Sequence, residues 1–479
     1  MHLQFSPRHS SRSAVLALVL AVLAAVNPLF AQSANSNADS AKIAKKLTKL
    51  NRIDHIIVVY QENWSFDSLY GYFPGANGLQ NAVSNPYPQL SASNTPLTSV
   101  PQPIINGAPD VRFNGVTLPV GPYNLAQYVP ADGLTGDIVH RFYHEQYQIY
   151  GKSVDPAVQA TPGTNQHFVN GSDNGGLVMS YFDATNLPEG QLAQQYTICD
   201  NFFHSAFGGS FLNHQFLIAA AAPSWPLTAP GPSVSDPNNP VNKDNQVTPD
   251  GFAVNTSFSI NQPHPASSTN PALLVPDQTN ATIGDRLSDH GVSWKWYSGG
   301  WDDALAGHAD PLFQYHHQPF IYYKNYADGT AAKAAHLQDE KNFFADLQNG
   351  GLPAVSFIKP LGPDNEHPGY TSLTRGQQHV ADIVQAVQNS PFWKNTVIIV
   401  TYDEHGGRWD HVSPPIIDRW GPGVRVPAII ISPFAKRGFV DHAQNETLSI
   451  LKLIEERFGL DPLSSRDANA NDLLEAFQD

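Results

Sequence analysis

Six short apolar runs recur along the chain, and each has the length of a buried β-strand. They are continuous rather than alternating, which is typical of strands that are covered on both faces. They read HIIVVY, YTICDNFF, VSWKWY, AVSFIK, NTVIIVTY and VPAIIIS, at residues 55–60, 196–203, 292–297, 354–359, 395–402 and 426–432. The pattern predicts a sheet that lies in the interior of the protein.

Segments with a helical pattern separate several of these runs. One begins at Asp137 (DIVHRFYHEQYQIYG), where the aspartate would cap the helix; a second, HLQDEKNFFADLQNGG, ends on glycine; a third, GQQHVADIVQAVQNSPFW, runs up to Pro391. The alternation predicts an α/β fold with a central, largely parallel sheet flanked by helices. Two stretches rich in Pro, Asn and Ser, Asn85–Asp110 and Pro223–Asn280, are predicted to be long loop excursions, and each could shape a substrate entrance.

Polar residues follow four of the apolar runs. In open α/β sheets, ligands bind beyond the carboxyl ends of the strands. We therefore expect the side chains that follow these runs to meet at one edge of the sheet. They are Glu62 and Asn63, then Ser210, then Asp364, Asn365, Glu366 and His367, and finally Asp403, Glu404 and His405.

The stretch TYDEHGGRWDHV is the richest of these clusters. Two adjacent carboxylates, Asp403 and Glu404, are followed by two histidines, which together offer oxygen and imidazole ligands and no sulfur. Taken alone, Asp403 is as readily a loop cap as a metal ligand. Glu62 and Asn63 at the end of a parallel strand favour the metal interpretation, and the ligand types fit several divalent ions.

The stretch FGGSFLNHQF offers a nucleophile, Ser210. Two glycines let the backbone turn before it, and a helical pattern follows, so Ser210 would lie among free N–H groups that suit an anionic phosphoryl group. The alternative is an ordinary helix cap. Leu212 stands where a serine esterase elbow has its second glycine, which weakens a carboxylesterase interpretation.

The chain has 19 histidines, and several lie near the acidic clusters. His140 and His144 are spaced four residues apart, which would place both on one face of a helix. His316 and His317 are adjacent, and His367 follows GPDNE. Histidines near acidic strand ends can bind phosphate oxygens when protonated, or protonate a leaving alkoxide.

Composition narrows the class of protein further. Hydrophobic residues make up 41% of the 479 residues and charged residues 14%, as in a globular protein, and the formal net charge of −15 disfavours a nucleic-acid partner. The single cysteine, Cys199, allows no internal disulfide, and its apolar surroundings predict a buried, inert thiol.

The N-terminus has the pattern of an export signal. Arg8 and Arg12 precede an apolar run, residues 14–26, that is too short to span a bilayer, and small residues follow up to Ala31. We expect a signal peptide over residues 1–31, a polar segment over 32–50 and a catalytic domain over 51–479. The expected location is the periplasm or the extracellular space, without a stable membrane span after cleavage; an uncleaved anchor is the alternative.

These motifs, in this order, resemble the bacterial phosphoesterase family that contains acid phosphatase A-like enzymes and non-toxin phospholipases C, in the alkaline phosphatase superfamily. The resemblance covers residues 54–458 and implies an alkaline-phosphatase-like α/β fold. Its motifs are ENWSFDSLYG, CDNFFHSAFGGSFLNH, KPLGPDNEHPGY, YDEHGGRWDHV and RVPAIIISPFAKRG. Trp64 is a departure, since many members have arginine there.

The resemblance also implies roles for individual residues. It implies that Ser210 is the nucleophile, and a phosphoseryl intermediate that water then hydrolyses is expected. A divalent metal ion is the expected cofactor. The implied metal ligands are Glu62, Asn63, Ser210, Asp403 and Glu404, and the implied phosphate-facing histidines are His144, His316, His317 and His367.

The expected activity is hydrolysis of small phosphomonoesters by an enzyme of the acid phosphatase type. Phospholipase C action on phosphodiester head groups is the alternative within the same fold. A metal-independent serine esterase would use Ser210 with a histidine and an acid, and would ignore chelators. A non-catalytic envelope or carbohydrate-binding protein would display aromatic loops such as WKWYSGGW. Neither of these two explains acid and amide side chains at strand ends.

Overall fold

The computed structural model describes residues 42–82, 88–153 and 162–479. The expected signal peptide and the first part of the polar segment lie outside these residues. Residues 42–50 are helical, and residues 42–52 form one compact unit with Asp479. The second unit, Ile53–Gln478, carries all the features discussed below. In the described part of the chain, every helix is too short or too polar to cross a membrane.

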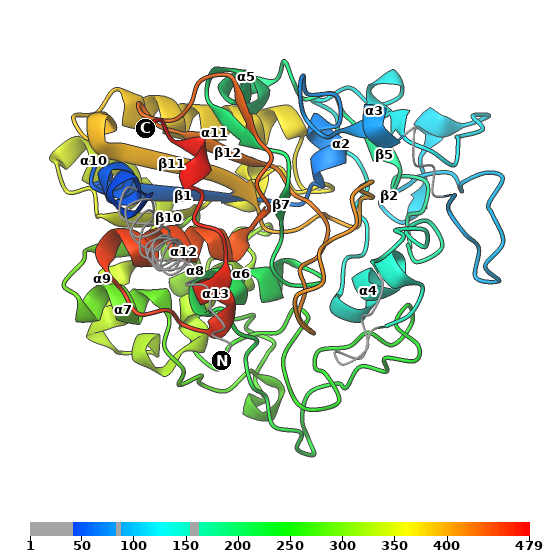
Figure 1. Cartoon of the computed structure of the whole chain (residues 1–479). Coiled ribbons are helices and arrows are strands. Elements are labelled where there is room, and N and C mark those ends of the chain that lie inside the picture. Colours follow the sequence, from blue (N-terminus) through cyan, green and yellow to red (C-terminus); the bar gives the residue numbers. More distant parts are fainter. Residues whose placement is uncertain (1–41, 83–87, 154–161) are drawn as a thin grey trace, which may run out of the picture. The chain divides into compact units, whose positions relative to one another are not determined.

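An eight-stranded sheet forms the centre of the second unit, with the strand order β13-β6-β12-β11-β1-β10-β8-β9 (Figure 1). Neighbouring strands pair in parallel except at β12, which runs antiparallel to both of its neighbours. The predicted, largely parallel sheet is therefore confirmed. The strands are β1 (His55–Gln61), β6 (Thr197–Cys199), β8 (Trp294–Ser298), β9 (Leu337–Asp339), β10 (Val355–Lys359), β11 (Thr396–Tyr402), β12 (Ala428–Ile431) and β13 (Phe439–Asp441).

Helices cover both faces of this sheet, which explains why its strands are apolar without alternation. On one face α5 (Pro188–Gln195) packs against α11 (Leu373–Gln388), and on the other α6 (Ser210–Ala219) packs against α12 (Thr447–Phe458), as Figure 1 shows. Every residue of β11 is buried, and so is every residue of β1 after His55. The other α-helices are α2 (Phe66–Tyr70), α3 (Leu79–Ala82), α4 (Phe142–Tyr150), α7 (Ile283–Asp289), α8 (Trp301–Leu305), α9 (Ala331–His336), α10 (Glu340–Asn349) and α13 (Ser465–Asn469).

The predicted strand over residues 196–203 is two strands. After β6 the chain leaves the main sheet, and β7 (Phe202–Phe203) pairs with β14 (Asn445–Glu446) in a separate two-stranded sheet. Cys199 ends β6 and is fully buried, and burial raises the pKa of its thiol well above the usual value. The expectation of a buried thiol is therefore confirmed, and that it is inert stays a prediction.

The predicted helix at Asp137 begins later than expected. α4 starts at Phe142, and the carboxylate of Asp244 accepts the N–H groups of Tyr143 and His144, at 2.6 and 2.9 Å. A distant loop therefore caps this helix, and no local sequence signal marks its start. His140 precedes the helix, so the expected shared helical face of His140 and His144 is wrong.

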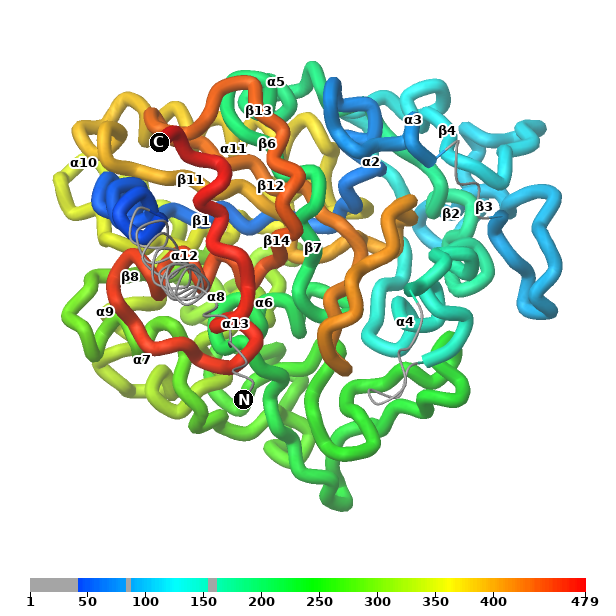
Figure 2. The backbone as a smooth tube through the Cα atoms, in the orientation of Figure 1, coloured from blue at the N-terminus to red at the C-terminus, as the bar shows by residue number. Residues whose placement is uncertain are grey.

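The second predicted loop excursion is confirmed. Within residues 223–280 the structure has isolated bridges and one short 3-10 helix, Pro271–Leu273. Figure 2 shows this segment in green as a succession of loops. Its hydrogen bonds to the start of α4 place it beside the edge of the sheet where the polar residues gather.

Candidate active site

Three neighbouring parallel strands, β10, β1 and β11, end at the same edge of the sheet. Gln61 pairs with Tyr402, so the next residues along, Glu62 and Asp403, lie side by side. The N–H of Asp403 donates to the carbonyl of Gln61 at 3.0 Å. Because successive side chains of a strand point to opposite faces, Glu62 and Asp403 share one face, while Gln61 and Tyr402 share the other.

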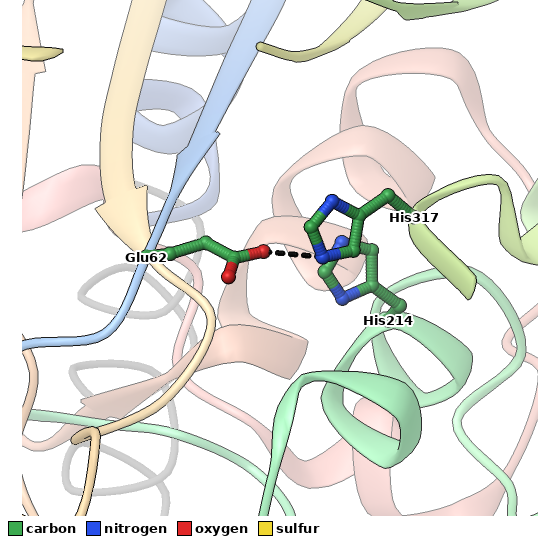
Figure 3. Close-up of side chains that lie close together, drawn as sticks. All are labelled: Glu62, His214 and His317. Carbon is green, nitrogen blue, oxygen red and sulfur yellow. Dashed lines mark ion pairs between the residues drawn. The ribbon is translucent and has the colours of Figure 1, made fainter. Parts of the chain in front are cut away.

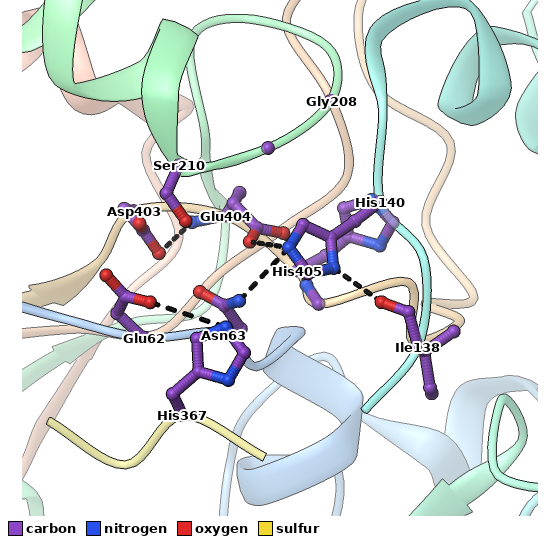
Figure 4. Close-up of polar contacts among 12 residues, drawn as sticks. Glu62, Asn63, Ile138, His140, Gly208, Ser210, His367, Asp403, Glu404 and His405 are labelled. Carbon is purple, nitrogen blue, oxygen red and sulfur yellow. Dashed lines mark hydrogen bonds and ion pairs between the residues drawn. The ribbon is translucent and has the colours of Figure 1, made fainter. Parts of the chain in front are cut away.

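Carboxylates are concentrated on the first of these faces. Glu62, Asp403 and Glu404 are at most 1% exposed, and Asn63 is fully buried with them (Figure 4). The ammonium group of Lys359, the last residue of β10, lies 2.7 Å from Glu62 Oε1 and 3.8 Å from Asp403 Oδ2. A single lysine therefore lies close to two of the three carboxylates.

Ser210 faces the same cluster. It is the first residue of α6, and Gly209 occupies the cap position, so the helix-cap alternative does not apply. Its side chain points toward the carboxylate of Asp403, as Figure 4 shows. The turn before it requires glycine, because Gly208 has a φ of +89° and an added Cβ would lie 2.5 Å from the backbone nitrogen of Phe142.

Three histidines lie beside the carboxylate of Glu62 or pack against a ring that does. His317 Nε2 lies 2.5 Å from Glu62 Oε1, and His367 Nε2 lies 3.7 Å from Glu62 Oε2. The ring of His316 packs edge-on against His317 with a centroid separation of 4.6 Å. All three histidines expected from the sequence at these positions therefore lie at the cluster.

His214 joins them, although sequence reasoning did not select it. Its ring stacks on His317 at 5.0 Å with an interplanar angle of 2° (Figure 3). Its Nδ1 lies 2.7 Å from the carbonyl oxygen of Ser210 and 3.7 Å from Asp403 Oδ2. The signal was present, since His214 lies four residues after Ser210 and so shares its helical face.

The structure places His140 at the site and leaves His144 away from it. His140 Nε2 lies 3.3 Å from both Glu404 Oε1 and Asn63 Nδ2, and its Nδ1 donates to the carbonyl of Ile138 (Figure 4). His144 is buried inside α4, where burial lowers its pKa to about 3, and it is absent from the cavity wall. The sequence could not reveal this difference, because the helix was predicted to start at Asp137 and in fact starts at Phe142.

The carboxylates at this edge differ in their pKa values. Burial alone would raise the pKa of Glu62, but His317 and Lys359 outweigh it and hold that pKa well below its usual value. Burial, then the charge of Glu62, raise the pKa of Asp403 to about 7. Burial and the charge of Asp403 raise the pKa of Glu404 well above its usual value. The positive charge here is too small for all three carboxylates to ionise.

The histidines beside them are held neutral. Burial lowers the pKa of His316 well below its usual value and that of His317 to about 4. Lys359 adds to the effect on both rings, because its charge opposes a second positive charge nearby.

The donor set fits a divalent cation. Within the described chain, five buried side-chain oxygens of this cluster form no hydrogen bond, which is costly unless a cation binds them. They are Glu62 Oε1 and Oε2, Asn63 Oδ1, Asp403 Oδ2 and Glu404 Oε1. Carboxylate and amide oxygens are ligands that hard divalent ions prefer. The group Glu62, His214 and His317 also brings three possible ligand atoms within 4.8 Å of one another.

A cavity of about 610 Å³ opens above this cluster. The lining residues that belong to the cluster described above form its floor: Glu62, Ser210, His316, His317 and His367. Its wall includes residues 233 and 244–246 of the long excursion, together with Asp137, Val139, His140, Arg141, Asp173 and Gln314. The excursion thus shapes the entrance to the cavity, as its composition suggested.

A second group of buried side chains lies behind the floor. Glu145 Oε1 is 3.0 Å from His204 Nε2 and 3.5 Å from His405 Nε2, and Glu145 Oε2 accepts the N–H of Gly208 at 2.5 Å. Gly208 is two residues before Ser210, and His405 directly follows Glu404. Glu145 therefore contacts both segments that carry the cluster, a long-range role with no signal in the sequence.

The buried serine, the carboxylates and the histidines at the edge of this α/β sheet define a hydrolase of phosphoric esters. The phosphoesterase family model matches residues 53–461, and the chain belongs to the phosphoesterase family.

Known relatives are phospholipases. The chain is 25% identical to phospholipase C B of Mycobacterium tuberculosis, over 89% of this chain and 78% of that protein. It is 24% identical to the non-hemolytic phospholipase C of Burkholderia pseudomallei, over 85% of this chain and 55% of that protein. A solved alkaline phosphatase superfamily protein from Vibrio parahaemolyticus matches 61% of this chain and 64% of its own, at 12% identity and a TM-score of 0.35.

Proposed function

We propose that this protein hydrolyses phosphomonoesters, with Ser210 as the nucleophile and a divalent metal ion as the cofactor. The observation that carries the proposal is the position of Ser210. It lies at the floor of the cavity, at the start of α6, with its side chain beside the buried carboxylate of Asp403. Backbone N–H groups of a helix start favour an anionic group at this point.

The proposed reaction has two steps. In the first, Ser210 Oγ attacks phosphorus, its proton passes to Asp403, and the bond from phosphorus to the alcohol oxygen breaks. In the second, water hydrolyses the phosphoserine, and Ser210 regains its proton. Asp403 is placed to take this proton, because its carboxylate lies beside the Ser210 side chain.

The metal ion would be held by oxygens of Glu62, Asn63, Asp403 and Glu404, together with Ser210 Oγ. When bound, the ion would supply positive charge that stabilises the developing charge on the phosphoryl oxygens. Lys359 would keep Glu62 ionised in this arrangement, because it pairs directly with that carboxylate. The type of ion follows from none of these contacts, since several divalent ions accept such ligands.

The histidines would divide into two groups. His316 and His317, which burial keeps neutral, would donate hydrogen bonds to phosphoryl oxygens, and His317 would gain a charge only near pH 4. His140 and His367 line the cavity beside Glu404 and Glu62, and we place the protonation of the leaving oxygen on one of them.

Hydrolysis of p-nitrophenyl phosphate tests the proposal. Ser210→Ala should lower kcat by at least about a thousandfold, as expected when a nucleophile is removed. Chelation should abolish the activity of the wild type, and metal added back should restore it. Wild-type turnover by Ser210→Ala would refute the nucleophile, and full activity in chelator would favour the metal-independent serine esterase.

Phospholipase C action on phosphodiesters is the second candidate. The relatives named above are phospholipases C and align with most of this chain. A cavity of about 610 Å³ also leaves room for a leaving group beyond the phosphoryl group. p-Nitrophenyl phosphorylcholine, assayed beside p-nitrophenyl phosphate, separates the two, because only a diesterase releases nitrophenol from it directly.

We also propose that the enzyme is exported, to the periplasm or beyond. The support is the apolar run at residues 14–26 and the small residues before position 32. N-terminal sequencing of the protein recovered from the periplasm and the medium would test this. A mature N-terminus near Gln32 is expected.

A further inference from the structure

Apart from His140, the wall of the cavity is not used by the chemistry proposed above. With the phosphoryl group at the floor, the wall would face the alcohol part of the ester. Wall residues on the excursion include Asn245 and Thr256, and Gln314 lies on a separate segment. The nature of these side chains bears on which alcohol the site accepts.

This wall is held in place by its own hydrogen bonds. Asn255 Oδ1 accepts the N–H of Phe142 at 3.0 Å, and its amide donates to Asp244 Oδ1 at 2.7 Å. Asp244 in turn accepts two N–H groups at the start of α4. A wall anchored in this way is pre-organised, so a ligand loses little affinity in ordering it.

Several wall groups keep free hydrogen-bonding capacity. Among the described residues, the side chains of Gln314 and Thr256 form no hydrogen bond although both line the cavity, and Asn245 uses only its amide nitrogen, for Val234. Asp137 and Asp173 each accept one backbone N–H through a single oxygen, at 2.8 and 2.9 Å. The wall thus offers amide, hydroxyl and carboxylate groups that are ready for a ligand with many hydroxyl groups.

The charge of the wall disfavours an anionic alcohol as the leaving group. Three acids, Asp137, Asp173 and Asp244, face one base, Arg141, so a leaving group with further negative charge is repelled. Apolar side chains are few among the lining residues: Val139, Phe211 and Val254. A long hydrocarbon group would therefore leave polar side chains unpaired, which is costly.

A cationic alcohol would be attracted by the acids of the wall, but a quaternary ammonium group also relies on open aromatic faces. The aromatic lining residues other than histidine are Phe211 and Tyr370. The ring of Tyr370 stacks on His367 with a centroid separation of 3.8 Å, and that of Phe211 packs against Tyr322 at 5.4 Å. Each of these rings therefore has part of its surface taken.

We propose that the alcohol part of the substrate is a neutral polyol, so that the enzyme hydrolyses phosphomonoesters of sugars or sugar alcohols. The proposal rests on the phosphomonoesterase function proposed above. One water enters, the bond from phosphorus to the polyol oxygen breaks, and inorganic phosphate and the free polyol leave. The polyol hydroxyls that do not react form hydrogen bonds with the wall. Their partners are the side chains of Gln314, Thr256, Asn245, Asp137 and Asp173.

Matched substrates test this with the metal-loaded wild-type enzyme. Glycerol 3-phosphate and n-propyl phosphate differ in their hydroxyl groups alone, so their intrinsic reactivities are close. We expect kcat/KM to be at least tenfold higher for glycerol 3-phosphate, and higher still for glucose 6-phosphate. Equal values for the first pair, or a preference for phosphocholine over both polyol esters, would overturn the proposal.

Variants locate the effect in the wall. Gln314→Leu and Thr256→Val should each lower the ratio of kcat/KM for glucose 6-phosphate over n-propyl phosphate by about three- to tenfold, the effect of one lost hydrogen bond. This ratio is independent of the fraction of folded enzyme. Gln385→Leu, on the exposed side of α11, is the matched control and should leave both values unchanged. An unchanged ratio in both wall variants would contradict the assignment.

The same assays separate the two proposals. Hydrolysis of p-nitrophenyl phosphate without any preference for polyols overturns only the substrate class. Absence of phosphomonoester hydrolysis overturns the proposed function, and the substrate class with it.

Discussion

The two faces of the sheet edge carry two acid clusters with opposite character. On the closed face, Tyr402 lies between two glutamates, with its hydroxyl 2.7 Å from Glu366 Oε2 and 3.1 Å from Glu189 Oε2. Gln61 donates to Glu366 Oε1 at 3.0 Å. On the open face, Glu62 and Asp403 border a cavity. Gln61 directly precedes Glu62 in the chain, and Tyr402 directly precedes Asp403.

The two faces differ in which of their acids are ionised. Burial raises the pKa of Glu189 to about 7 and, together with the charge of Glu189, raises that of Glu366 well above its usual value, so this pair keeps at least one proton at neutral pH. On the open face a close polar contact with His317 and the charge of Lys359 keep Glu62 ionised, and the charge of Glu62 then opposes that of Asp403. Glu189 and Glu366 share a proton, so their side chains are stable together without a cation. Asp403 and Glu404 lie beside an ionised Glu62, so both can ionise only when a cation is bound.

The largest expected effect separates the faces by activity. Asp403→Asn keeps the shape of the side chain but removes a proposed base and metal ligand, so kcat should fall by about a thousandfold and bound metal should be lost. Tyr402→Phe, one residue earlier on the closed face, should lower kcat by less than about tenfold. Steady-state kinetics and metal analysis of both proteins check this. Similar losses of kcat in the two variants would remove the functional distinction between the faces.

The closed face should instead control stability through pH. The folded-state pKa of Glu189, about 7, is above its unfolded value, so its stabilising proton is fully present below about pH 4.5 and is lost as pH rises through 7. The contribution lost is about 3 kcal/mol. Glu189→Gln cannot ionise, so its Tm should fall less than that of the wild type between pH 5 and 8. Thermal unfolding of the metal-free proteins measures this, and parallel Tm curves would contradict it.

Metal removal should act on the open face. A divalent ion at one hundred times its Kd stabilises a folded protein by about 2.7 kcal/mol. Because Asp403 and Glu404 must lose protons to bind it, the rise in Tm on adding metal should be larger at pH 8 than at pH 5. Asp403→Asn should lose most of this rise, whereas Glu189→Gln should keep it. An equal rise in both variants would place the ion elsewhere.

The fold was largely predictable from the sequence because its strands are buried on both faces and stand out as apolar runs. The positions of Glu62, Asn63, Asp403 and Glu404 followed from the rule that parallel strands end at one edge. Their roles as ligands stay predictions.

Other contacts at the site depend on distant segments. His140 could not be separated from His144, since Asp244, about a hundred residues away, sets the start of α4. The pairing of Lys359 with Glu62 could not be predicted either, because a lysine at the end of an apolar strand can as readily point into solvent. The pairing of Glu189 with Glu366 arises only from packing between α5 and the loop after β10.

The smallest expected effect concerns Glu145, which lies behind the open face and holds the Gly208 turn. His204 and His405 lower the pKa of Glu145 to about 2 against the effect of burial, so it is a carboxylate under all ordinary conditions. Glu145→Gln keeps an acceptor for the N–H of Gly208 but loses the charge that pairs with the histidines. We expect kcat to fall about tenfold, with KM changed less than twofold, because Ser210 is displaced while the binding wall is intact.

A second buried glutamate provides the control for this variant. Glu455, on α12, has its pKa raised to about 9 by burial and lies outside the cavity, so Glu455→Gln should leave kcat unchanged. A merely structural role for Glu145 would lower Tm and the active fraction without changing kcat per folded molecule. Titrating active sites by the burst of nitrophenol therefore distinguishes the two outcomes. A normal kcat per active site in Glu145→Gln would show that the open face keeps its geometry without this support.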